Sequence, residues 1–181
     1  MKRWIVFLAL ALTLVATGVA TAQPTHSNIG LGFHNVQAPL GVRWWFTGQK
    51  VALDAGIGFG SHEDPATDED LSDFAFDIGV PIRLKSWDRV HFMVRPGILY
   101  TSEEEVIDFG PPVDTDNTTS MTVQAELEVE VFLAESVSFS AAHGIGVTNV
   151  DDAGGGSSSF MGTTGNNFTT IGFHVYLFGG Q

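Results

Sequence analysis

The sequence contains no cysteine and few basic residues. Its 181 residues include 8 Lys and Arg against 21 Asp and Glu, for a formal net charge of −13 at pH 7. Without cysteine the chain forms no disulfides, so backbone pairing and side-chain packing must stabilise the fold. It offers no basic patch of the kind that binds nucleic acid, so we expect no nucleic-acid partner. After residue 22 it also contains no apolar run long enough to cross a membrane as a helix.

The one long apolar run lies at the N-terminus. Lys2 and Arg3 precede a nearly unbroken apolar run over residues 5–16, and Ala20 and Ala22 supply the small residues of a signal-peptidase site. This order is typical of a secretory signal peptide, and the run is shorter than the about 20 residues of a transmembrane helix. We therefore predict a signal peptide at residues 1–22, cleaved after Ala22, and one domain at residues 23–181. Because no cysteine follows the cleavage site, the sequence excludes a lipoprotein anchor.

Apolar and polar residues alternate along much of the chain, whereas helix-period apolar patterns are hard to find. Residues 51–60 place an apolar side chain at every odd position and a small or charged one at every even position, and residues 73–85 and 123–133 repeat the pattern. Successive side chains of a strand point to opposite faces, so each segment has one oily face. We predict an all-β protein of about eight strands, the others at residues 28–36, 40–46, 89–101, 137–148 and 168–178. Pro81 and Pro96 fall within predicted strands, and because proline donates no ladder hydrogen bond we expect a local irregularity at each.

The predicted connections alternate in length. Tight turns are expected at residues 47–49, 86–88 and 134–136, and long polar loops at 61–72, 102–120 and 149–167. The connection at 37–39 is the exception, because it lies on the same side of the barrel as the long loops but is short. Tight periplasmic turns and long outer loops are typical of outer-membrane barrels. The loops are predicted to be solvated and mobile, and any extracellular ligand would contact them.

The face opposite the oily one carries small residues and ionisable groups. Three acidic side chains in one row, Glu126, Glu128 and Glu130, cannot be buried in a dry core without partners. An eight-stranded barrel has an interior just wide enough for side chains. We predict that an ion-pair network fills this lumen and that Arg83 and Arg95 pair with its carboxylates. Its predicted members are Arg43, Asp54, Asp77, Arg83, Arg95, Glu126, Glu128 and Glu130.

Aromatic residues gather near both ends of the predicted strands. Outer-membrane barrels carry aromatic girdles at both membrane–water interfaces, so we predict the same here. The predicted girdle residues are Trp44, Phe46 and Trp87 near the tight turns, and Phe59, Phe74, Tyr100 and Phe168 near the long loops.

The signal peptide, the alternating segments at 51–60, 73–85 and 123–133, and the terminal strand at 171–178 together resemble the small outer-membrane β-barrel families, the OmpA/OmpX-like group. This resemblance implies an up-and-down antiparallel transmembrane barrel in the outer membrane, in a non-enzymatic structural or surface-interaction role. It implies outer-membrane lipids and the outer-membrane assembly machinery as partners, and a monomer. Family members usually end on an aromatic residue that the machinery recognises, whereas this chain continues three residues beyond Phe178.

Two other functions remain open at this stage. A soluble lipocalin-like binding barrel in the periplasm would show similar alternation, although a ligand cavity is mostly apolar. A lipid A-modifying enzyme would need a His and a Ser at the rim; His143 lacks the H-x-S arrangement of the deacylases, and alternation points it towards lipid. His91 and His174 are expected to be interior polar side chains. No His pair has metal-ligand spacing and residues 114–117 only loosely match a calcium loop, so we expect no metal site and no cofactor.

Overall fold

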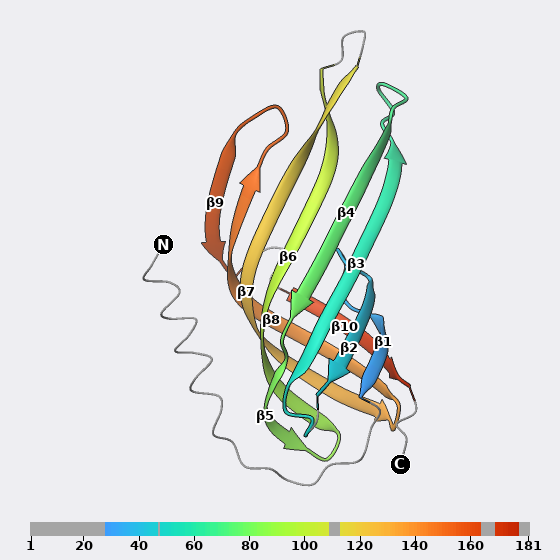
Figure 1. The fold of residues 1–181 in the computed structure, drawn as a ribbon, viewed down its shortest axis with the longest axis vertical. Helices are drawn as coiled ribbons and strands as arrows, with labels where there is room; N and C mark the ends of the chain where they lie inside the picture. The colour runs from blue at the N-terminus through green and yellow to red at the C-terminus, as the bar shows by residue number, and fades with distance from the viewer. Residues whose placement is uncertain (1–27, 47, 109–112, 164–168, 178–181) are drawn as a thin grey trace.

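The computed structural model describes residues 28–46, 48–108, 113–163 and 169–177, and their regular structure is entirely β (Figure 1). The predicted signal peptide at 1–22 and the predicted girdle residue Phe168 lie outside these ranges. Among the described residues, no helix is long and apolar enough to cross a membrane. The strands are β1 (Ile29–Phe33), β2 (Leu40–Trp45), β3 (Ala52–Glu63), β4 (Asp70–Gly79), β5 (Ile82–Trp87), β6 (Val90–Asp108), β7 (Asp114–Ala134), β8 (Val137–Asp151), β9 (Ser157–Gly162) and β10 (Thr169–Tyr176).

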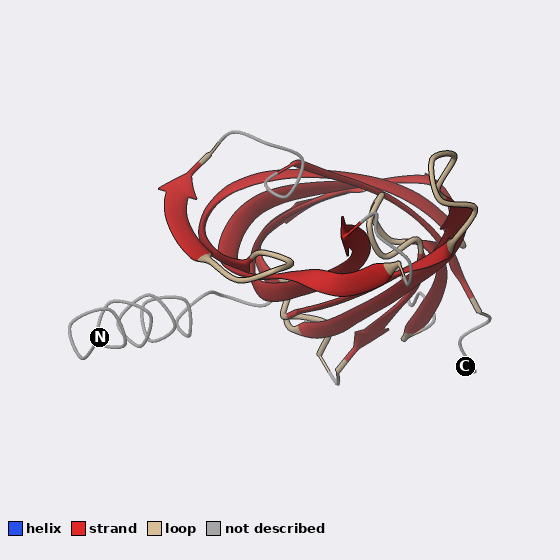
Figure 2. Cartoon of the chain, turned by 90° about the horizontal axis from the view of Figure 1, so that it is seen from above, coloured by secondary structure: helices blue, strands red, loops and turns tan. Residues whose placement is uncertain are grey.

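The strands form one closed antiparallel barrel, which Figure 2 shows from above. Sequential neighbours pair around the wall, and β10 pairs with both β8 and β1, which closes the ring. β5 continues the wall strand of β4 along β6, while β9 and β10 pair with successive parts of β8. The ten segments therefore make eight wall strands. The predicted all-β antiparallel architecture of about eight strands is confirmed.

The predicted strand at 73–85 is interrupted at Pro81, close to Pro96 of the neighbouring strand. β4 ends at Gly79 and β5 begins at Ile82, and Pro96 of β6 lies opposite the gap. The Val80 amide donates to the Pro96 carbonyl at 2.9 Å, and the Ala52 amide donates to the Pro81 carbonyl at 2.9 Å, so the wall stays continuous. Pro81 thus coincides with a break, as predicted. Pro96 itself keeps regular pairing with Ala125 on its other side, so the irregularity expected at Pro96 lies in the strand that faces it.

The three predicted long loops are shorter than expected, because strands continue into each of them. β6 and β7 stay paired from Ser102 with Thr119 to Asp108 with Asp114, within the segment 102–120. β3 and β4 likewise stay paired to Glu63 with Asp70, within 61–72, and β9 pairs with β8 inside 149–167. In segment 102–120, threonine and valine are residues favoured in strands, and they suit the continued pairing. The barrel therefore extends into hairpins formed by β3 with β4, β6 with β7, and β8 with β9, which stand above the short strands β1, β2 and β10 (Figure 1). We call these extensions the raised hairpins.

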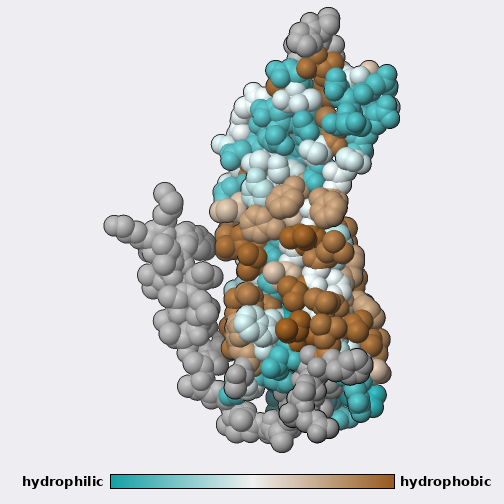
Figure 3. All heavy atoms as spheres, turned by 45° about the vertical axis from the view of Figure 1, so that its right-hand side comes forward, coloured by the Kyte–Doolittle hydropathy of each residue, from teal (hydrophilic) through white to brown (hydrophobic). Residues whose placement is uncertain are grey.

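The polarity of the barrel is inverted relative to a soluble one. Arg43, Asp54, Asp77, Glu126 and Glu130 are at most 2% exposed, while large apolar side chains project outward. Figure 3 shows apolar residues, in brown, gathered over the lower part of the face in view, with hydrophilic residues on the raised hairpins. We call the outward set the apolar belt; on the walls it includes Ile29, Leu31, Phe33, Leu40, Trp44, Ile57, Phe59, Phe74, Ile78, Ile98, Met121, Val123, Leu127, Val129, Leu133, Phe139, Ile145, Ile171, Phe173 and Val175.

Candidate functional site in the lumen

Arg43 on β2 is the first of two guanidinium centres in the lumen. Its Nε and Nη2 atoms donate to the two carboxylate oxygens of Asp54 at 2.8 and 2.7 Å, in the fork geometry that suits an arginine and a carboxylate. Arg43 and Asp54 are cross-strand partners on β2 and β3, so the strand register alone brings them together. Arg43 Nη2 also donates to Glu128 Oε1 at 2.6 Å, and Nη1 lies 3.4 Å from Glu130. One guanidinium therefore serves three carboxylates.

Arg95 on β6 is the second centre. It donates to Glu126 Oε2 at 2.8 Å, to Asp54 Oδ2 at 3.2 Å and to Asp77. Asp54 contacts both arginines and so joins the two halves of the network. All five predicted carboxylates are bound, and further neutral donors support them: Thr170 to Glu126 at 3.1 Å, and Ser138 and Tyr176 to Glu130 at 2.7 Å each.

The ion pairs given above join seven of the eight predicted network residues. The eighth is Arg83, on β5. Its guanidinium carbon stacks 4.3 Å from the ring centroid of Trp45, at the turn end of the lumen. Arg83 therefore makes a cation–π contact at this end of the lumen, and its predicted pairing with the carboxylates stays a prediction.

An aromatic cluster closes the turn end of the lumen. Trp45, Met93, Phe132 and Tyr176 are buried together with Ala52, and Trp45 Nε1 donates to Tyr176 Oη at 3.2 Å. His91 lies beside this cluster, 4.9 Å from the Phe132 ring and with Nδ1 3.6 Å from Glu130. His91 and His174 are both buried in the lumen, which is the position expected for them.

The connection between β1 and β2 closes the opposite end from inside. His34, Asn35 and Ala38 are buried. Asn35 Nδ2 donates to Asp77 at 2.9 Å and accepts from the Ala38 amide at 2.6 Å, while His34 Nε2 lies 3.0 Å from an Arg95 nitrogen. We call residues 34–39 the inner plug. The sequence pattern predicts a short connection here and gives no sign that it enters the barrel.

Inward-facing glycines make room for the inner plug. A Cβ on Gly58 would run into the carbonyl oxygen of Gln37, and one on Gly56 would meet the carbonyl oxygen of Ala38 at 2.9 Å. On β2, a Cβ on Gly41 would overlap the side chain of His34. The plug can therefore sit in the lumen only because these wall positions have no side chain.

Most predicted girdle residues described by the structure point outward. Trp44, Phe59, Phe74 and Trp87 are 49%, 73%, 46% and 55% exposed, and Phe46 is 39% exposed. Trp44 packs edge-on against Phe46 near a tight turn. At the other end of the belt Tyr100 stacks on Phe76, an outward aromatic that the sequence analysis did not single out.

The raised hairpins carry their own polar contacts. Glu104 accepts hydrogen bonds from the Thr115 and Ser72 hydroxyls at 2.9 Å each and from the Ser72 amide at 3.2 Å, and these bonds lower the pKa of its carboxyl below the usual range. At the hairpin tips, amide hydrogen bonds from Gly154 and Asn117 lower the pKa of Asp116 in the same way. Lower down, His143 points outward and its Nδ1 lies 2.8 Å from Thr169 Oγ1. Among the described residues, no group of three or more His, Asp or Glu is placed to hold a metal ion.

The fold and lumen define a closed, eight-stranded antiparallel β-barrel with a charged, filled interior. No protein-family model matches the chain, and no curated protein or solved structure matches it.

Proposed function

We propose that the chain is exported through a cleaved signal peptide and inserts into an outer membrane as a monomeric, non-enzymatic barrel. Its role would be structural or one of surface interaction, through the raised hairpins. The observation that carries this proposal is the inverted polarity: large apolar side chains face outward while Arg43, Arg95 and their carboxylates are buried. In water this arrangement would leave the apolar belt exposed to solvent, which is unfavourable. In a bilayer the apolar belt would contact acyl chains, while the paired charges stay inside the lumen.

The lumen argues against the soluble lipocalin-like alternative. A binding cavity for a small apolar ligand is lined mostly by hydrophobic side chains. Here the centre of the lumen is occupied by seven charged side chains that contact one another, with an aromatic cluster below and the inner plug above. The filled interior supports a scaffold that presents its hairpins to the exterior, and the acidic residues of those hairpins would meet the partner.

The first experiment asks whether the polypeptide needs an apolar medium. We expect residues 23–181, expressed without the leader and refolded from urea, to become folded only with detergent or lipid vesicles. The folded form should migrate faster than the boiled form on a gel, and it should resist proteolysis over the wall strands. A monodisperse, folded protein in buffer without detergent would overturn the proposal.

A further inference from the structure

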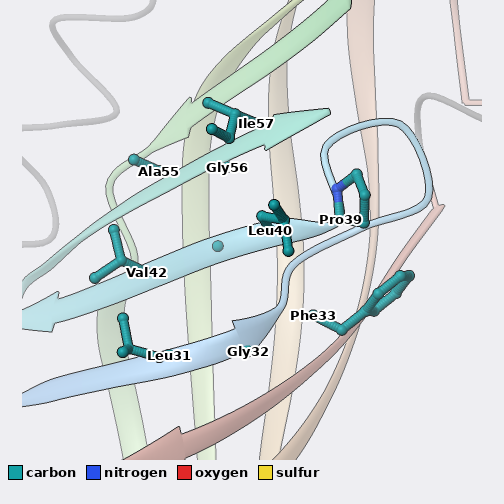
Figure 4. Close-up of a pocket in the computed structure, with 10 residues that line it drawn as sticks. Leu31, Gly32, Phe33, Pro39, Leu40, Val42, Ala55, Gly56 and Ile57 are labelled. Atoms are coloured by element: carbon teal, nitrogen blue, oxygen red, sulfur yellow. The ribbon is translucent and has the colours of Figure 1, made fainter. Parts of the chain in front are cut away.

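The upper part of β3 has a wall neighbour on one side only. β4 pairs with β3 up to Glu63, whereas the pairing of β3 with β2 stops where Ile57 faces Leu40. Figure 4 shows Ile57 and Leu40 on these neighbouring strands, where they line an apolar hollow of about 620 Å³ on the outer wall, within the apolar belt. Above this level, no described strand pairs with residues 58–63 on the β2 side. We call that side of residues 58–63 the free edge.

The free edge borders a gap in the wall. Six of the eight wall positions continue into the raised hairpins, through β3, β4, β6, β7, β8 and β9, because β9 follows β10 along β8. The other two do not continue, since β1 ends at Phe33, β2 begins at Leu40, and the inner plug lies between them. At the level of the raised hairpins the described strands therefore form an open sheet, with one edge at β3.

Three residues of the free edge direct their backbone groups into this gap. Lower on β3, the Ala52 amide donates to Pro81, on the β4 side. The register with β4 is unbroken, and successive residues of a paired strand direct their N–H and C=O groups to alternate sides. Phe59, Ser61 and Glu63 therefore face away from β4, and all three are exposed. Such an edge is a template for a further strand, and residues 58–63 include neither the proline nor the lysine that commonly block pairing.

The inward side of the free edge opens onto an acidic pocket. Gly60 faces Asp73 in the register of β3 with β4, and Asp73 faces Glu103 in the register of β4 with β6. All three residues line a pocket of about 270 Å³, together with Val36 of the inner plug, and His62 lies 3.6 Å from Asp73. A Cβ on Gly60 would have only Asp73 within 4 Å. A side chain placed beside Gly60 in the gap would therefore have an open path to the carboxylates.

We propose that the free edge binds an extended segment of a partner polypeptide, which pairs antiparallel with β3 in the position that β2 leaves open. A Lys or Arg of that segment lies opposite Gly60 and donates hydrogen bonds to Asp73 and Glu103. Main-chain hydrogen bonds give the affinity, and the charged side chain gives the specificity. The inference deepens the proposed surface-interaction role and rests on it, because it names the part of the raised hairpins that meets the partner.

The probe is a capped, fluorescently labelled peptide, Thr-Val-Thr-Lys-Thr-Val-Thr, whose β-branched residues favour an extended chain. Fluorescence anisotropy measures its binding to the folded barrel in maltoside micelles at pH 8, where histidine is ordinarily neutral. We expect one site per barrel, with an affinity about tenfold above that of the same peptide with Glu in place of Lys.

Two N-methylated peptides test the main-chain pairing on the unaltered protein. With Lys opposite Gly60, the two threonines next to Lys direct their N–H groups to β3, whereas the two valines direct theirs away. N-methylation of those threonines should abolish binding, and N-methylation of the valines should preserve it. Hydrogen exchange should show new protection of the Ser61 amide on binding of the unmodified peptide.

Two pairs of protein variants locate the site. Ser61→Pro removes an N–H group of the free edge and should abolish binding, whereas Ser159→Pro removes one that faces away from β8 on β9 and should preserve it. Asp73→Asn with Glu103→Gln should abolish the preference for Lys over Glu. Glu105→Gln with Asp114→Asn removes equal charge from the raised hairpins and should preserve the preference. Each variant is first checked for the faster gel mobility of the folded barrel.

Absence of binding, equal affinity for the Lys and Glu peptides, or equal effects of the two N-methylated peptides would overturn the inference. A dimer in micelles that Ser61→Pro dissociates would identify a second copy as the occupant and would overturn it as well. These failures are separate from failure of the proposed membrane location. A barrel that inserts into vesicles but binds no peptide contradicts only the inference, whereas a barrel that folds without detergent contradicts the membrane location itself.

Discussion

At the scale of single residues, the lumen depends on two arginines, each of which contacts three of five buried carboxylates. Arg95 contacts Asp54, Asp77 and Glu126, and each of these is fully buried. Removing one partner of a buried ion pair is far more costly than the pair's net stabilisation, because the remaining charge stays buried without compensation.

Arg95→Met is therefore expected to destabilise the folded barrel by about 3–5 kcal/mol. Urea unfolding of the protein in vesicles, followed by tryptophan fluorescence, measures the change. Arg89→Met removes the same charge at an exposed turn and should change the free energy of unfolding by less than about 0.5 kcal/mol. Equal unfolding midpoints for the two variants would contradict the assignment of Arg95 as the centre of the network.

At the scale of elements, the inner plug fits against the wall strand β3 because β3 has glycine at the positions of contact. Gly58 lies against the carbonyl of Gln37, whereas Gly60, two residues further on the same face, has only Asp73 within 4 Å of a Cβ position. Replacing either glycine by alanine has the same intrinsic effect on the strand, so a difference between the two variants isolates the contact with the plug.

Gly58→Ala is expected to displace the inner plug and to destabilise the barrel by about 1–3 kcal/mol, while Gly60→Ala is close to neutral. Hydrogen exchange reports the displacement directly: the Ala38 amide, which donates to Asn35 in the wild type, should lose protection only in Gly58→Ala. Identical exchange over residues 34–39 in both variants would show that the plug does not depend on the glycine.

The raised hairpins are expected to loosen in acid because Glu104 ties them together. Its folded-state pKa is lowered by hydrogen bonds from Thr115 and Ser72. The stabilisation is therefore present above the unfolded pKa, about 4.3, and is lost as the pH falls through the lower folded value.

Amide exchange at Ser72, measured from pH 7 to pH 3, should show protection that declines at the acid end in the wild type. Glu104→Gln cannot titrate, so its protection should be weaker at neutral pH and should lack that acid-dependent decline. Parallel profiles for the two proteins would exclude Glu104 as the titrating group.

At the scale of the whole molecule, the apolar belt is the feature that favours a bilayer over water as the medium around the barrel. Leu127 lies at the centre of the outward row of β7 and is 56% exposed. An arginine at such a position costs about 2–4 kcal/mol at the middle of a bilayer. In water the same exposed substitution would be nearly neutral.

Leu127→Arg should accordingly lower the stability of the vesicle-inserted barrel by about 2–4 kcal/mol. Thr119→Arg, on the outward face of the same strand but in the raised hairpin, should have little effect. Urea titration of both variants in vesicles makes the comparison. Equal stabilities would place Leu127 outside the hydrocarbon region.

Most of the strands, their inward and outward faces and most of the lumen charges can be predicted from the sequence alone. Period-two alternation fixes which side of a strand a residue occupies, so the inward positions of Arg43, Asp54 and Glu128 follow from it directly. What lies across the barrel from each residue depends on the three-dimensional packing. The contact of Arg95 with Asp54, the stacking of Arg83 on Trp45 and the entry of residues 34–39 into the lumen depend on register and on space left by distant glycines. These are contacts between residues far apart in the sequence, and a local pattern of apolar and polar residues does not predict them.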